Sequence, residues 1–180
     1  MTKQYFTKQI IYLFHQEDCL PMKHYDPETF SSKSSLGYLL KINHSLMHDC
    51  ADRIFAAHDI SFVQWIALKK LNDGSALTAS DLCREMRHDN GALTRLLDQL
   101  EERGYVERQR SKQDRRVVDL QITDAGLLKV KELTPLVVDN LNNILDPFSA
   151  EEFSQLTGLL NKLKVRLEEY AADKTSDTPS

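Results

Sequence analysis

The sequence predicts a mainly α-helical fold with one small β-hairpin. Apolar residues recur three and four positions apart through much of the 180-residue chain, which is the period of an amphipathic helix. Residues 105–122 break this period, because two β-rich runs there flank a polar loop. Two short helices directly precede this hairpin. The order of these elements is that of a winged helix-turn-helix, here with further helices on both sides.

Before this central module the chain divides into two parts. Residues 1–33 are predicted to form an N-terminal extension, which Pro21 and Pro27 punctuate. Residues 34–60 follow as one long amphipathic helix, whose start a pair of serines can cap.

Residues 61–126 are assigned to the winged helix-turn-helix. Ser61 with Gln64, and Thr78 with Asp81, have the spacing of capping boxes, in which each side chain bonds the other residue's backbone N–H. Each pair therefore predicts the start of a helix.

The helix that follows the turn begins at Asp89 or Asn90, since either side chain can cap it. Its buried stripe consists of leucines at helical spacing, namely Leu93, Leu96, Leu97 and Leu100. Gly104 predicts its end, and Thr123 is predicted to cap the helix that comes after the hairpin.

Residues 127–170 are assigned to C-terminal helices. The first runs from about Asp124 to Leu145, and Pro135 could kink it. The second starts at the capping sequence after Pro147. The tail at residues 171–180, rich in Ser, Thr and Asp, is expected to be disordered.

Charge is distributed unevenly along the chain. The net charge of -4 argues against a general nucleic-acid coat, but it permits a sequence-specific binder with a local basic patch. The hairpin loop and its first strand carry such a patch, with one anion, Asp114, among these cations: Arg108, Arg110, Lys112, Arg115 and Arg116. This local excess of positive charge favours phosphate contacts.

A short helix followed by a basic hairpin predicts contact with two neighbouring grooves of double-stranded DNA. Four residues at the start of that helix are candidates for the major groove: Asn90, Gly91, Thr94 and Arg95. Arg95 suits guanine, because its guanidinium can bond O6 and N7 together. Thr78, Ala79 and Ser80 begin the preceding helix, whose free N–H groups suit a phosphate.

Several motifs occur in order along this module. They are Leu-Thr-Arg in the second short helix, Leu-Glu-x-x-Gly-Tyr-Val-x-Arg, Asp-Arg-Arg at residues 114–116, and Leu-x-Ile-Thr-x-x-Gly at residues 120–126. In these motifs, and over roughly residues 34–168, the chain resembles the MarR-type winged-helix transcription regulators. The resemblance implies a DNA-binding regulator, most often a repressor. It also implies that Arg116 enters the minor groove and that Asp114 orients it.

The resemblance further implies a homodimer, in which the N- and C-terminal helices pack across a twofold axis. The C-terminal helices carry apolar residues that fit such an interface: Leu133, Leu136, Val137, Leu141, Ile144, Leu145, Phe148, Phe153, Leu156, Leu159, Leu160 and Leu163. The alternative from patterning alone is an intramolecular core. A twofold would place two reading helices about one DNA turn apart, roughly 34–36 Å, on a pseudo-palindromic operator.

A small molecule, often aromatic or phenolic, typically releases members of this family from DNA. The resemblance places its pocket between the first long helix and the helix at 62–71, with Tyr38, His44, His48 and Trp65 as candidates. For Trp65 the pattern favours a plain core role over a place in the pocket. The ligand acts only through different affinities for two dimer geometries.

Two other sensing chemistries remain open. His44 and His48 are four residues apart, with Cys50 and Asp52 nearby, so one helical face could hold a metal ion. Thiol oxidation is the second, although Gly37-Tyr38 stands where peroxide-sensing relatives carry a cysteine. Cys19 or Cys50 could substitute, whereas Cys83 is expected to be a small buried hydrophobe.

Other classes of function are disfavoured. An enzyme is not expected, because the six glycines are scattered and no nucleophile–base pair is evident. No cofactor is expected. A winged helix that binds only protein remains an alternative, against which the basic hairpin argues. Three separated cysteines and the lack of a long apolar run favour a cytoplasmic protein without a membrane segment.

Overall fold

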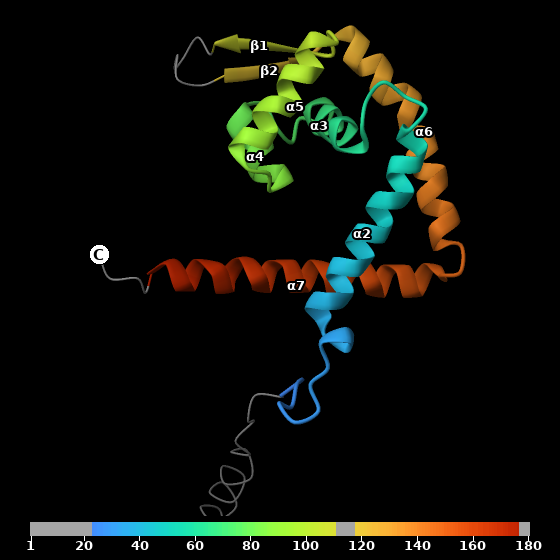
Figure 1. Ribbon diagram of the computed structural model, residues 1–180, viewed down its shortest axis with the longest axis vertical. Helices are drawn as coiled ribbons and strands as arrows, with labels where there is room; N and C mark the ends of the chain where they lie inside the picture. The colour runs from blue at the N-terminus through green and yellow to red at the C-terminus, as the bar shows by residue number, and fades with distance from the viewer. Residues whose placement is uncertain (1–22, 111–117, 177–180) are drawn as a thin grey trace, which may run out of the picture. The chain divides into compact units, whose positions relative to one another are not determined.

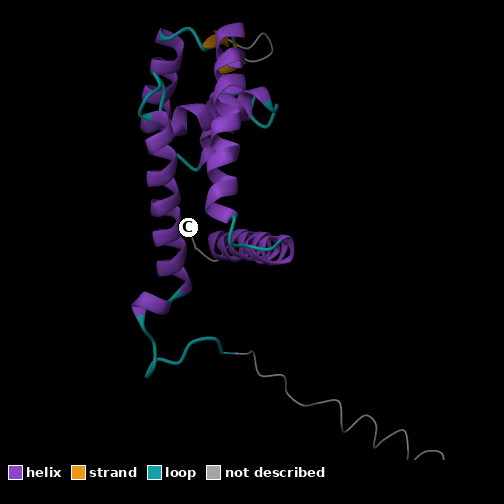
Figure 2. Cartoon of the chain, turned by 90° about the vertical axis from the view of Figure 1, so that its right-hand side faces the viewer, coloured by secondary structure: helices purple, strands orange, loops and turns teal. Residues whose placement is uncertain are grey.

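A computed structural model describes residues 23–110 and 118–176. Its elements in chain order are η1 (Ser32–Ser34), α2 (Leu36–Phe55), α3 (Phe62–Asn72), α4 (Ala79–Met86), α5 (Asn90–Glu102), β1 (Val106–Arg110), β2 (Val118–Ile122), α6 (Asp124–Leu145) and α7 (Ala150–Ser176) (Figure 1). Helices form nearly all of this regular structure, and β1 and β2 are the two strands of the described residues (Figure 2). The mainly α fold with one hairpin is confirmed. The chain forms two units, Met1–Leu46 and Met47–Ser180.

In the first unit, the described part of the N-terminal extension packs on itself just before α2. The rings of Tyr25 and Phe30 meet edge to face, with centroids 5.5 Å apart. The Tyr25 hydroxyl accepts a hydrogen bond from the backbone N–H of Leu36 at 2.8 Å, which satisfies one of the free donors at the start of α2.

The core of the second unit lies among α3, α4, α5, α6 and the hairpin. Its largest fully buried side chains are Leu68, Leu82, Leu100, Leu133 and Val106. All four leucines of the predicted stripe on α5 are buried. Burying this apolar stripe is what fixes the direction of α5, because it leaves the polar faces of the helix outward.

The hairpin is antiparallel, and its register pairs Val106 with Ile122 and Arg110 with Val118. Residues before α4 extend the sheet on the other side of β2. Thr78 forms an isolated bridge with Asp119, and the N–H of Leu120 donates to the Leu77 carbonyl at 2.9 Å. The start of α4 is therefore joined to β2 of the hairpin.

The predicted helix ends are found at the expected residues. Ser61 with Gln64 and Thr78 with Asp81 form complete capping boxes, and Thr123 caps α6. Asp89 caps α5, accepting from the N–H of Ala92, so the choice between Asp89 and Asn90 is settled. Gly104 follows α5 with φ +71°, a conformation that glycine adopts without steric cost.

One boundary in the C-terminal region is corrected. Helix α7 continues to Ser176, so the expectation of disorder from Ala171 is wrong for residues 171–176. Ala171 and Ala172 are strong helix formers, and neither Gly nor Pro interrupts residues 171–176. Residues 177–180 lie outside the described residues. Helix α6 runs on through Pro135 to Leu145.

No helix within residues 23–110 and 118–176 is both long enough and apolar enough to cross a membrane.

Candidate nucleic-acid interface

The N-terminal half of α5 presents the predicted reading residues outward. Asn90, Gly91, Thr94 and Arg95 are all exposed, on the side away from the buried leucines. The carboxylate of Asp89 accepts from the Ala92 N–H at 2.8 Å. This bond is the largest of the causes that hold the Asp89 pKa below its ordinary value. The Gly91 N–H and the charge of Arg95 lower this pKa further, so the cap fixes the first turn of α5 chiefly through backbone N–H groups.

Two of these residues also make local bonds. The Thr94 hydroxyl donates to the Asn90 carbonyl at 2.7 Å, and the Asn90 side-chain oxygen accepts from the Cys83 thiol at 3.1 Å. The Cys83 thiol also lies 2.9 Å from the His88 carbonyl oxygen. The half-buried Cys83 thus links α4 to the turn before α5, in a more polar setting than a small buried hydrophobe would have.

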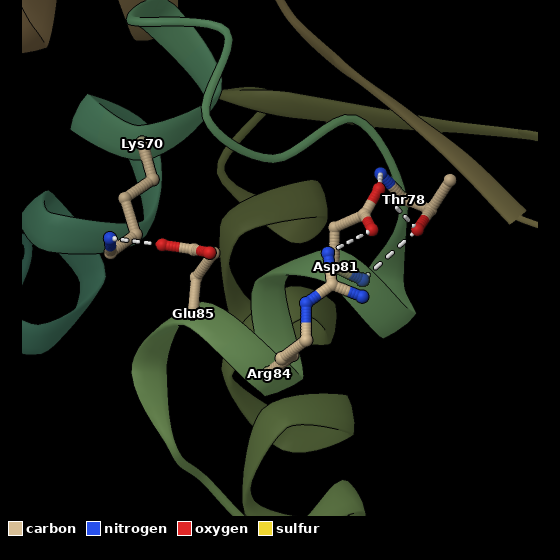
Figure 3. Close-up of polar contacts among 5 residues, drawn as sticks. All are labelled: Lys70, Thr78, Asp81, Arg84 and Glu85. Carbon is tan, nitrogen blue, oxygen red and sulfur yellow. Dashed lines mark hydrogen bonds and ion pairs between the residues drawn. The ribbon is translucent and has the colours of Figure 1, made fainter. Parts of the chain in front are cut away.

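The start of α4 is occupied by its own cap. The carboxylate of Asp81 accepts from both the hydroxyl and the N–H of Thr78, at 2.8 and 3.2 Å (Figure 3). Arg84 adds a 2.7 Å ion pair to the same carboxylate. These contacts, with the Thr78 hydroxyl bond the largest, lower the Asp81 pKa.

The three residues predicted to contact phosphate at the start of α4 are therefore not equally accessible. Thr78 is half-buried and bonded to Asp81, and Ala79 is half-buried, whereas Ser80 is exposed. Farther along α4, Glu85 pairs with Lys70 of α3 at 3.2 Å, which joins the two helices (Figure 3).

Sequence reasoning missed a basic residue in the turn between α4 and α5. Arg87 ends α4 in the left-handed region with φ +50°, and its guanidinium pairs with Glu168 of α7 at 3.0 Å. A non-glycine residue with positive φ is uncommon. Nothing in the sequence indicated that Arg87 would adopt this conformation, because arginine is not enriched in it.

The wing residues that the sequence singled out fall into two groups. Arg108 and Arg110 belong to β1, and Arg110 is exposed. The side chain of Arg108 is only 25% exposed, because it bonds to α5. The remaining predicted wing contacts lie outside the described residues: Lys112, Asp114, Arg115 and Arg116.

The four candidates for a ligand pocket belong to different units. Tyr38 and His44, both exposed, lie in the first, and His48 and Trp65 lie in the second. Trp65 is 8% exposed and stacks on Phe62, as expected of a core residue. Its indole N–H is buried and bonds no acceptor within the described part of the chain. The His48 ring meets Phe62 edge to face at 5.5 Å.

A pocket of about 450 Å³ in the second unit has a different lining. It lies between the end of α2, the loop after it, the start of α3 and the end of α5, and its residues are Asp52, Phe55, Ala56, His58, Asp59, Ile60, Ser61, Gln64, Gln99 and Arg103. This pocket shares the expected location between α2 and α3, but none of the four candidates lines it. The sequence did not indicate its lining, because residues from the loop after α2 and from α5 meet only in the fold.

Beside this pocket, polar side chains join three segments. The Tyr105 hydroxyl donates to the Asp59 carboxylate, and Lys129 of α6 pairs with Asp59 at 3.2 Å and with Glu132 at 2.9 Å. The Tyr105 bond is the largest cause that lowers the Asp59 pKa, and the same bond raises the Tyr105 pKa. The pKa of Lys129 is raised, chiefly by Glu132. The base of the wing is thereby fastened to α6 and to the loop before α3.

The structure also places residues that the sequence suggested for metal sensing and for thiol oxidation. His48 lies 3.2 Å from Asp52, yet residues 23–110 and 118–176 hold no group of three His, Cys, Asp or Glu side chains arranged for a metal. Cys50 and Cys83 are half-buried free thiols. Cys19 lies outside the described residues.

Comparisons with known proteins agree with this geometry. Residues 60–118 match the model of the MarR family. The transcriptional regulator PecS of Dickeya dadantii is 32% identical over 127 residues, which are 68% of this chain and 76% of PecS. The transcriptional repressor MprA of Escherichia coli is 29% identical over 124 residues, covering 68% of this chain and 70% of MprA.

A solved structure has the same fold. The crystal structure of a mutant E. coli MarR complexed with operator DNA is 28% identical, with a TM-score of 0.66, and the match covers 71% of this chain and 92% of that one. The helix-turn-helix, the wing and the flanking helices of this chain are thus those of a known group of regulators. The chain belongs to the MarR family of DNA-binding transcriptional regulators.

Proposed function

We propose that this protein represses transcription as a homodimer, reading a pseudo-palindromic operator through α5 and the wing, and that a small aromatic molecule releases it. The observation that carries the DNA part is the outward N-terminal half of α5, where Thr94 and Arg95 are exposed over buried leucines. MprA, a relative, is named a repressor, and the MarR structure contains operator DNA.

Arg95 is the residue that we expect to read a base. Its exposed guanidinium can reach two acceptors on one guanine, and losing such a pair costs about 1–3 kcal/mol. The test is binding of R95A to a duplex that the wild-type protein selects from a random pool. The expected result is a loss of affinity together with a relaxed preference at one position of the site.

A matched control lies at the other end of the same helix. Arg103 is also exposed, but it forms the C-cap of α5, away from the predicted reading end. We expect R103A to keep the sequence preference of the wild type. If R95A and R103A behave alike on the selected duplex, Arg95 does not read a base.

The dimer proposal is supported by apolar side chains that the chain itself leaves exposed. On α7 these include Phe153, Leu156 and Leu160, at 43%, 40% and 43% exposure. They recur at helical spacing on one face, and α2 carries exposed leucines as well. Exposed apolar patches of this kind mark interaction sites. A second copy is the occupant that the family resemblance indicates.

Light scattering tests the dimer. We expect wild-type protein to be dimeric at micromolar concentration and L156E/L160E to be monomeric, because two buried charges would lack partners. Ser154 lies about 160° around α7 from Leu156 at 100° per residue, so S154E is the control that should stay dimeric. A monomeric wild type would refute the proposal.

The effector proposal rests on the resemblance, and the single tryptophan gives it a direct assay. Trp65 lies beside Phe62 and Phe55, so an aromatic ligand bound near this cluster should change its fluorescence. Salicylate and benzoate serve as probes, with free tryptophan amide correcting for absorbance. A ligand that changes neither Trp65 emission nor DNA affinity at millimolar concentration is not an effector of this kind.

A further inference from the structure

Arg108 leaves the wing strand β1 and lies against the reading helix α5. One guanidinium nitrogen, Nη1, donates to Asp98 Oδ1 at 2.5 Å and to Glu101 Oε2 at 3.1 Å. The other, Nη2, donates to the backbone carbonyl of Thr94 at 3.2 Å. A single side chain of β1 therefore bonds α5 at three positions.

These three acceptors lie along one side of α5. Positions 94, 98 and 101 are four and three residues apart, which places them above one another on a helix. All three acceptors converge on one guanidinium, because each lies within 3.2 Å of one of its nitrogens. Three bonds from one planar group restrain both the position and the tilt of β1 against α5, since sliding or rotation would break at least one of them.

The same contacts disfavour a phosphate contact for Arg108. Its donors are directed at two carboxylates, and its side chain is 25% exposed, against 56% for Asp98 and 43% for Glu101. A phosphate would have to displace these acceptors and approach two negative charges. Arginine rather than lysine suits the arrangement, because a planar fork can hold several acceptors in fixed directions.

The restraint acts next to the reading residues. The Thr94 carbonyl that Arg108 bonds belongs to the residue directly before Arg95. Binding two grooves at once requires a fixed distance between α5 and the wing, because the groove spacing of the duplex is fixed. If the wing were loose, α5 and the wing could each still contact the DNA backbone. They would no longer align with the two grooves at the same time.

We propose that Arg108 is a positioning residue for DNA recognition: through Asp98, Glu101 and the Thr94 carbonyl it sets the distance between α5 and the wing, and it does not bind phosphate. This replaces the phosphate role that the sequence indicated for Arg108. The proposal rests on the proposed function, since it concerns how the same interface selects its operator.

The experiment compares R108A and R108K with the wild type on two duplexes, the selected duplex and a scrambled one, across a range of salt. We expect R108A to bind the selected duplex about tenfold more weakly, as for the loss of one charged hydrogen-bonding group. Binding of the scrambled duplex should change less than about twofold, and the slope of affinity against salt should stay constant. R108K should not restore the selected-duplex affinity.

Arg110 is the matched control, because it lies two residues along β1 and on the same face of the strand, and it is exposed. R110A is expected to weaken both duplexes alike. Loss of a phosphate contact lowers the salt slope by about one unit. If R108A lowers the slope, weakens both duplexes equally and is rescued by R108K, Arg108 binds phosphate and the proposal is wrong.

A second variant approaches the same bonds from α5. In D98A/E101A both side-chain acceptors are removed while Arg108 stays. Removal of two negative charges would by itself strengthen binding to both duplexes equally. Loss of the restraint would instead lower the ratio of the affinity for the selected duplex to the affinity for the scrambled duplex. An unchanged ratio overturns the proposal even if R108A does not fold, which circular dichroism would reveal.

Failure of the proposed function gives a different result. Wild-type protein would then prefer no sequence from the random pool, and the selected and scrambled duplexes would bind alike. A wild type that discriminates, with an R108A variant that discriminates equally well, refutes only the positioning role.

Discussion

Gly126 lies in the first turn of α6, against the backbone of Tyr105 just before β1. An added Cβ would lie 2.3 Å from the Tyr105 carbonyl oxygen and 2.8 Å from Ile122 Cγ1. Ordinary carbon–oxygen contacts begin at about 3.3 Å, so G126A requires a shift of roughly 1 Å. The obstacle is backbone, which cannot rotate away as a side chain can.

The size of the effect follows from what must move. The Tyr105 carbonyl accepts from the Thr123 N–H at 3.1 Å, so its displacement weakens a bond worth about 1 kcal/mol. Overpacking of this kind costs about 1–3 kcal/mol, and the helix preference of alanine returns at most about 1 kcal/mol. We therefore expect G126A to lose about 1–3 kcal/mol of unfolding free energy, or roughly 3–10 °C in Tm.

Thermal unfolding followed by circular dichroism at one protein concentration measures this change. Gly158 provides the control, since nothing lies within 4 Å of an added Cβ there. It lies about 200° around α7 from Leu156, on the face opposite the apolar stripe, so G158A should keep or raise Tm. A G126A protein that melts at or above the wild-type temperature would refute the steric argument.

Three further predictions concern single contacts. T78A removes a helix cap and should cost about 1 kcal/mol in chemical unfolding, whereas T78S should behave as wild type. L100A should cost about 2–5 kcal/mol in the same assay, because Leu100 is fully buried; a loss below 1 kcal/mol would contradict its place in the core. The folded-state pKa of Asp59 is lowered by Tyr105, so its stabilisation is present above the unfolded pKa and is lost as pH falls through the folded value. The stability difference between wild type and D59N should therefore shrink below about pH 4, and a difference constant from pH 7 to 3 would exclude this role.

Much of the fold could be read directly from local signals. The capping boxes at Ser61 and Thr78 and the leucine stripe on α5 are short-range patterns, and the structure forms each of them where predicted. The end of α7 was placed too early, because a gradual change in composition marks a helix end poorly when no glycine or proline stops it.

The site was predictable in part. Exposure of Thr94 and Arg95 follows from helical periodicity, and the structure agrees. The positioning role of Arg108 did not follow from the sequence. An arginine in a basic segment is expected to contact phosphate, and only the structure shows that Asp98 and Glu101 are its partners. Those acids are on another element, and no periodic pattern relates a strand residue to its partners on a helix.

The order of elements, their caps and the outward face of α5 are properties of neighbouring residues, so the sequence alone determined them. The tertiary structure decided which charges remain available at the surface. It pairs Arg108 with Asp98 and Glu101, and it fastens Tyr105 to Asp59 and leaves Arg110 exposed. The physical reason is that an ion pair depends on distance in space, which packing of the leucine core sets and spacing along the chain does not.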